Sequence, residues 1–385
     1  MTGGALPRLR TTAERWLDGT GDVRAIALLR IAAGPIVLIH LRPFLEIAAD
    51  GGSWDDTFHV PYAAWYPALS GGAWRALLWG AVAAAVLMSI GLFTRAATAY
   101  TAGFVAWNLF LSQTHFHHNR AFLVILLTGL AVLPVGRVLS IDAVIARSRG
   151  RPLAGAIGPL WPLIPMRFSV ATAYWASGLS KLLDPDWWGG VVLQLRIEQY
   201  GSSALDRGAP EWVIDLLASE AFMWWFAKVV VLTEVFIGVG LLVRRTRLAA
   251  VWVAIPFHLT IEATAEVQVF SLAGLCALVI WVTPTTRDRT LVVSGAGWAR
   301  RLGAAVRWLD WTGRFTVEQS DAGTAVTLYD RPGGTGAPIV RTGREAVWFV
   351  LSRLPLAFPI AAPVLPIRSR RGRRARRRNS RSTAG

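Results

Sequence analysis

The chain has 385 residues, of which 54% are hydrophobic and 17% are charged, and it carries a net charge of +16. A charged fraction this far below the roughly 25% of an average soluble protein excludes an ordinary soluble globular domain and indicates an integral membrane protein. The single cysteine, Cys276, excludes a disulfide framework and any CxxC redox or zinc site.

Eight apolar runs are long enough to cross a bilayer, since a transmembrane helix needs about 20 mostly apolar residues. They lie at residues 24–46, 73–93, 96–114, 121–138, 160–182, 221–243, 247–264 and 267–283. The arm before them, residues 1–23, lacks an apolar core followed by a small-residue cleavage site, so no cleaved signal peptide is predicted. We therefore expect an all-α, multi-pass membrane domain with eight transmembrane helices within residues 24–285.

Arginines mark every second loop of this domain. They lie in the N-terminal arm, after the second, fourth and sixth runs, and beyond the eighth, whereas the other loops are acidic and aromatic, as in "DPDWWGG". Loops rich in Lys and Arg stay in the cytoplasm. The alternation therefore predicts a protein of the cytoplasmic (plasma) membrane with both termini inside. Because topology accounts for the positive net charge, no nucleic-acid partner is expected.

A small cytoplasmic α+β region is expected at residues 286–367. The segment "FTVEQSDAGTAVTLYDRPGGTGAPIV" predicts two short strands around turns. The apolar run "EAVWFVLSRLPLAFPIAAPVLPI" holds Arg353 and several prolines, which favours a helix on the inner leaflet or packed on the small region over a ninth span. Residues 368–385 are expected to be a disordered Arg-rich tail, either drawn to anionic lipid of the inner leaflet or simply solvated.

Two lysines are conspicuous because all the other residues in the Lys-plus-Arg total of 40 are arginines. Lys181 lies near the outer end of the fifth run, Lys228 in the outer half of the sixth, and Glu234 near the middle of the sixth. Ionisable groups in membrane spans are rare and usually mark function, and a desolvated lysine can give up its proton whereas an arginine cannot. Simpler alternatives stay open: Lys181 can extend to the interface, and Lys228 can pair with a buried Glu.

Histidines gather at the same predicted depth. His40 lies in the outer half of the first run, and "HFHHNR" (115–120) forms the turn between the third and fourth runs. His258 and Glu262 are one helical turn apart on one face of the seventh run. Together with the lysines, these groups predict one outward-opening cavity. A helix-to-helix hydrogen bond is the alternative for His258, and no metal site is predicted because no Cys or second His pair stands at ligand spacing.

Several segments resemble one protein family. "RIAAGPIVLIHLRPF", "HHNRAFLVILL", "YWASGLSKLLDPDWWGG" and "FHLTIEATAEVQVFSLAGL" are similar to parts of the HTTM-type membrane domain of vitamin K-dependent gamma-glutamyl carboxylases and their bacterial relatives. The likeness covers residues 24 to 285, and the lysine-bearing segment is its most specific part.

The resemblance implies a reaction on the extracytoplasmic side, with a reduced quinone (vitamin K or menaquinol) as cofactor. In the carboxylases, the lysine that matches Lys181 deprotonates the quinol, whose anion reacts with oxygen and yields a strong base. His118, Asn119 and Arg120 would orient the quinone oxygens, and Arg120 is also a candidate for holding a carboxylate. The other polar residues assigned to the cofactor cavity are Lys228, Glu234, His258, Glu262 and His40.

Two functions from different classes follow. The first is a vitamin K-dependent carboxylase-like lyase and epoxidase that uses a membrane quinol and oxygen, with a protein or small-molecule substrate. The second is a non-catalytic quinone- or lipid-binding membrane protein, or a scaffold, that retains the fold. The family's turn reads Asn then His, and the arginine at position 120 favours the second function. The two spared lysines favour the enzyme.

Overall fold

The computed structural model describes residues 20–56, 58–151, 157–206, 208–264, 269–282, 289–295, 297–320, 324–331 and 337–361. The chain divides into two compact units, Met1–Thr283 and Pro284–Gly385. Most of the predicted N-terminal arm and the whole of the predicted Arg-rich tail lie outside the described residues.

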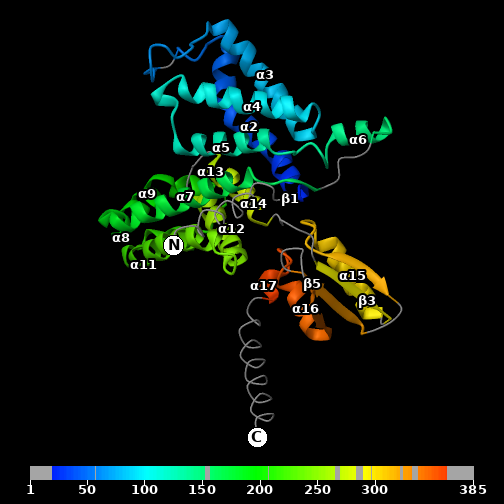
Figure 1. The fold of residues 1–385 in the computed structure, drawn as a ribbon. Helices are drawn as coiled ribbons and strands as arrows, with labels where there is room; N and C mark the ends of the chain where they lie inside the picture. The colour runs from blue at the N-terminus through cyan, green and yellow to red at the C-terminus, as the bar shows by residue number, and fades with distance from the viewer. Residues whose placement is uncertain are drawn as a thin grey trace, which may run out of the picture. The chain divides into compact units, whose positions relative to one another are not determined.

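The first unit is helical (Figure 1). A helix lies at each of the eight positions predicted from the apolar runs: α2 (Arg24–Ala49), α3 (Gly71–Ile90), α4 (Thr94–Phe110), α5 (His118–Val132), α7 (Leu163–Leu183), α11 (Glu220–Leu242), α12 (Arg247–Thr264), and α13 (Phe270–Ala277) followed by α14 (Val279–Val282). Within the described part of the chain, α2, α3 and α11 are long and apolar enough to cross a membrane. Eight crossings stay a prediction.

Shorter elements connect these helices: β1 (Thr20–Asp22), η1 (Gln113–His115), α6 (Ile141–Ser148), β2 (Ile157–Pro159), α8 (Pro185–Gly189), α9 (Val191–Asp206) and α10 (Glu211–Ala218). β1 pairs with β2 in an antiparallel two-stranded sheet. The segment between the fifth and sixth apolar runs is therefore largely helical. Ile197 of α9 packs with Leu217 of α10 and Met223 of α11, so this segment folds onto the start of α11.

A capped turn joins α7 to this segment. The carboxylate of Asp184 accepts hydrogen bonds from the backbone N–H groups of Asp186 (2.9 Å) and Trp187 (3.4 Å), and Pro185 begins α8. Both are preferred choices at a helix start. Gly190 ends α8 with φ of 92°, a conformation that glycine adopts without strain. The turn fixes the position of Trp187 close beyond the end of α7.

Glycines let α7 and α11 approach closely. A Cβ atom added to Gly178 would lie 2.9 Å from Cγ2 of Val235, and one added to Gly238 would lie 2.9 Å from the backbone nitrogen of Trp175. Small residues at a helix interface allow this kind of close approach. The polar side chains that the two helices direct toward each other are therefore held at short range.

The second unit contains a four-stranded sheet with two helices packed on it. Its elements are β3 (Arg289–Ser294), α15 (Gly297–Leu309), β4 (Thr316–Ser320), β5 (Val326–Asp330), β6 (Ile339–Thr342), α16 (Gly343–Leu351) and α17 (Phe358–Ala361). The strand order is β4-β3-β5-β6; β3 and β4 run parallel, joined through α15, and the other neighbours are antiparallel. Leu291 and Val293 of β3 face Leu328 and Val326 of β5 in register within the buried core.

The sequence-based reading of this unit was incomplete. The segment from Phe315 to Val340 contributes three strands where two were expected, and β3 was not predicted. The apolar run after β6 packs on the small unit, since Ala346 and Val350 are buried in its core. The region is therefore α+β.

Candidate functional site

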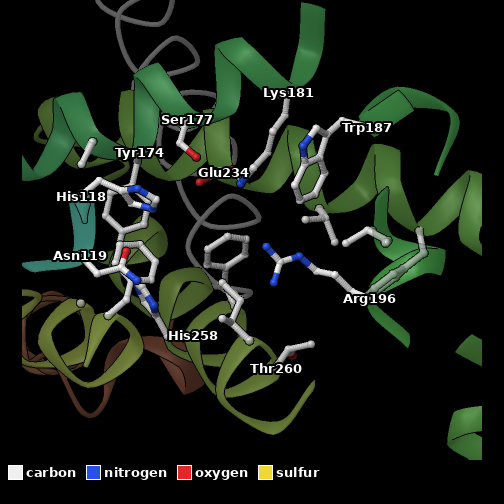
Figure 2. Close-up of a pocket in the computed structure, with 18 of the residues that line it drawn as sticks. His118, Asn119, Tyr174, Ser177, Lys181, Trp187, Arg196, Glu234, His258 and Thr260 are labelled. Carbon is white, nitrogen blue, oxygen red and sulfur yellow. Dashed lines mark hydrogen bonds and ion pairs between the residues drawn. The ribbon is translucent and has the colours of Figure 1, made fainter. Parts of the chain in front are cut away.

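A cavity of about 730 Å³ lies among eight helices of the first unit (Figure 2). Its walls come from α5, α7, α8, α9, α10, α11, α12 and α13. Five of the residues predicted from the sequence line it: His118, Asn119, Lys181, Glu234 and His258. The structure thus brings together polar groups that are more than 100 residues apart in the chain.

Lys181 and Glu234 form an ion pair at the centre of this set. Lys181 Nζ donates to Glu234 Oε2 at 2.6 Å, and the two side chains are 19% and 4% exposed. The ammonium also lies 4.7 Å from the ring centroid of Trp187, a favourable cation–π position. Removing one member would leave the other, largely buried charge without its partner, so the two residues act as a unit. A proton moving from Nζ to Oε2 would convert the pair into a neutral amine and a carboxylic acid.

Tyr174 and His258 form a second buried pair. The Tyr174 hydroxyl is hydrogen-bonded to Nε2 of His258, which is fully buried. Nδ1 of His258 is buried without a hydrogen-bond partner among the described residues, an arrangement that calls for a ligand or water. Gly274 makes room for this ring, because a Cβ atom there would lie 2.3 Å from Cε1 of His258. The bond joins α7 to α12, as the helix-to-helix alternative for His258 predicted.

The histidine-bearing turn reaches the cavity from α5. Nδ1 of His117 accepts a hydrogen bond from the Asn119 N–H at 3.2 Å and caps the helix, while its ring stacks on His118 at 4.2 Å between centroids. Burial, and the neighbouring His118 and Arg120, lower the pKa of His117. The ring is therefore neutral at pH 7, the form that can accept the capping bond.

Arg120 and His40 do not line the cavity. Arg120 donates from Nη1 to the carbonyl oxygen of His115 at 2.9 Å, and its guanidinium carbon lies 5.6 Å from the ring centroid of Phe44. His40 packs edge-on against the same Phe44 ring at 5.9 Å. Successive residues of a helix point in different directions, so Asn119 can face the cavity while Arg120 packs toward α2. The expected role of Arg120 as the group that holds a carboxylate has no support in this geometry.

Lys228 and Glu262 are also absent from the lining residues. Lys228 donates to the carbonyl oxygens of Trp188 (2.9 Å) and Trp224 (3.0 Å) and lies 3.3 Å from the Trp224 ring centroid. The ion pair with a buried Glu that was considered for Lys228 is instead made by Lys181. Glu262 is exposed, one turn beyond His258 on α12.

Other cavity residues were missed by sequence reasoning. Tyr174 and Ser177 precede Lys181 by seven and four residues on α7, so a helical period alone would have placed all three on one face. Arg196 and Trp187 gave no such signal, because they lie between the fifth and sixth apolar runs, where no helix was predicted.

The sequence model of one protein family, described as the HTTM domain, matches residues 20–285. The match covers more than half of the chain and includes every residue that lines the cavity. Neither curated proteins nor solved structures gave a match. Together with the long apolar helices, the family match indicates a membrane protein. The chain belongs to the HTTM domain family.

Proposed function

We propose that this chain is a membrane enzyme related to the vitamin K-dependent carboxylases, whose cavity binds a reduced quinone and whose Lys181–Glu234 pair accepts a proton from it. The observation that carries the proposal is the 2.6 Å ion pair within a cavity otherwise walled by aromatic, apolar and a few polar side chains. The family match supports the relationship to the carboxylases.

The cavity suits a quinol ring in size and chemistry. Its volume of about 730 Å³ is within the range of small-molecule sites, which are mostly apolar with a few convergent polar groups. Phe122, Phe226 and Phe257 supply aromatic walls, and Trp187 lies beside the lysine. A reduced quinone would supply the electrons for reaction with oxygen.

The pair provides a route for a proton. Separated charges are costly in an apolar cavity, so transfer of the Lys181 Nζ proton to Glu234 Oε2 gives a neutral form suited to that environment. The free amine of Lys181 can then take the proton of a bound hydroxyl group, and the resulting ammonium stabilises the oxyanion. Asn119, His118 and the Tyr174–His258 pair are the groups that would orient a second oxygen.

Turnover in membranes tests the proposal. Membranes with wild-type chain, Lys181→Arg or Glu234→Gln would be supplied with menaquinol and oxygen, and quinone epoxide measured. Because a positioned base contributes about 10²–10⁴-fold, both variants should lose about 100-fold or more. Lys228→Arg is the matched control and should keep its yield, since Lys228 does not line the cavity. Equal yields from wild type and Lys181→Arg would refute the proposed role of the lysine.

A non-catalytic quinone- or lipid-binding protein is the second candidate. It is favoured by the same ion pair, because a lysine neutralised by Glu234 at 2.6 Å can serve as a purely structural link between α7 and α11. Menaquinone binding by wild-type protein, together with no epoxide from any of the four membranes, is the outcome that selects this function.

A further inference from the structure

The guanidinium of Arg196 points into the cavity without a protein partner. Arg196 is half-buried on α9, and among the described residues nothing forms a hydrogen bond, ion pair or ring contact with it. Figure 2 shows its planar head directed toward the interior, below Trp187 and on the far side from His118. Arginine stays protonated in proteins, so an ionised group faces the cavity unpaired.

The charges of the lining residues do not balance. Apart from the histidines, the lining side chains that ordinarily carry a charge are Lys181, Arg196 and Glu234. Glu234 is already bound to Lys181 at 2.6 Å. One positive charge therefore remains, and a partly buried charge is stabilised by a paired counterion. The missing counterion should be a monoanion.

The residues around Arg196 indicate the chemical character of the rest of that anion. Leu193 and Ile197 lie beside it on α9, and Leu217 and Phe226 line the same cavity from α10 and α11. A guanidinium binds a carboxylate through two parallel hydrogen bonds. A monocarboxylate satisfies the single excess charge, whereas a phosphate dianion would leave a negative charge uncompensated.

We infer that the cavity binds a monocarboxylate with an apolar body, and that Arg196 holds its carboxylate. The monocarboxylate would be the substrate that reacts alongside the quinol, and this role as a substrate rests on the proposed function. Binding of the monocarboxylate itself requires neither quinol nor oxygen. The carboxylate would lie on the α9 side of the cavity, with the Lys181–Glu234 pair left free to serve the quinol.

Equilibrium binding tests the inference directly. Full-length protein in nanodiscs would be titrated with radiolabelled dodecanoate, after subtraction of empty nanodiscs, and dodecanol would serve as the neutral competitor. N-acetylglutamate α-amide, a monocarboxylate from a peptide rather than a lipid source, would be titrated in parallel. Variants are Arg196→Gln, Arg196→Lys and, as a matched control, Arg42→Gln, whose side chain is 79% exposed.

Loss of a charged hydrogen-bond partner should weaken dodecanoate binding by about tenfold or more in Arg196→Gln. Arg196→Lys should bind dodecanoate with intermediate affinity, because lysine keeps the positive charge but cannot donate two parallel hydrogen bonds to the carboxylate. Arg42→Gln should bind like wild type, dodecanol should not compete, and thermal unfolding of each variant checks that it is folded.

Equal dodecanoate affinity in wild type and Arg196→Gln would overturn the inference, as would efficient competition by dodecanol. Tighter, Arg196-dependent binding of N-acetylglutamate α-amide would overturn the apolar body in favour of a peptide source. Lys181→Arg separates this inference from the proposed function: it should lower epoxide formation by about 100-fold or more and leave Arg196-dependent dodecanoate binding intact.

Discussion

At the scale of single residues, Lys181 and Glu234 have mostly exchanged contact with water for contact with each other. The ammonium has the carboxylate at 2.6 Å and the Trp187 ring at 4.7 Å. Such a pair adds little to stability compared with well-packed apolar residues, yet breaking it on one side is expensive. The pair is therefore better explained by a role in proton transfer, or in fixing the position of α7 against α11, than by its contribution to stability.

A double-mutant cycle measures this coupling. Lys181→Met and Glu234→Gln should each lower the free energy of unfolding in detergent by about 3–5 kcal/mol, because each leaves an uncompensated buried charge. The double variant should lose clearly less than the sum. The exposed pair Arg42–Glu46, at 2.9 Å, is the control and should couple by only about 0.3–0.5 kcal/mol. Additive losses at Lys181 and Glu234 would contradict the buried pair.

The sequence predicted part of the site for a physical reason. Lys181, Glu234 and His258 are polar groups inside apolar runs, so their cost in a membrane made them candidates without knowledge of the fold. What polarity cannot give is the direction in which each side chain points. Arg120 and Lys228 therefore seemed equivalent to the others, although their contacts with Phe44 and Trp224 turn them away from the cavity.

At the scale of elements, hydropathy located the long helices because each is apolar over most of its length, including side chains such as Trp79 of α3 and Leu232 of α11 that the first unit leaves exposed. Hydropathy did not locate α8, α9 and α10, because their apolar residues are interspersed with polar ones. No helix was therefore predicted in this segment. For this reason Trp187 and Arg196 were not predicted as residues of the site. In the second unit, β3 was missed because its apolar run is short, and periodicity alone does not identify such a run as a strand.

The close packing of α7 on α11 gives a test at this scale. Gly238→Val would drive a side chain into the backbone of Trp175, and overpacking of this kind costs about 1–3 kcal/mol. By separating the helices it should also disrupt the Lys181–Glu234 pair and lower epoxide formation. Gly103→Val on α4 is the control, since a Cβ atom there meets nothing within 4 Å. Unfolding in detergent and epoxide yield should change in the first variant and not in the second; equal effects would argue against the glycine contact.

At the scale of the whole first unit, helices that lie far apart in the chain meet at one cavity. The starts of α5, α11 and α13 and the later halves of α7 and α12 contribute to one cavity. Near the opposite ends, Arg30 donates to the carbonyl oxygen of Ser89 at 2.8 Å, and Arg167 donates to that of Ile280 at 2.9 Å. Both arginines lie at the end that the charge pattern assigns to the cytoplasm. Location of the cavity on the extracytoplasmic side, with both termini inside, stays a prediction.

Photolabelling tests most directly the central claim that a reduced quinone occupies this cavity. Membranes holding the full chain would be irradiated with a diazirine-bearing menaquinol, and the labelled peptides identified by mass spectrometry. The predicted result is label within residues 117–122 and 174–200, suppressed by excess unlabelled menaquinol. Label confined to α3 and α4, or label that menaquinol does not displace, would contradict the account.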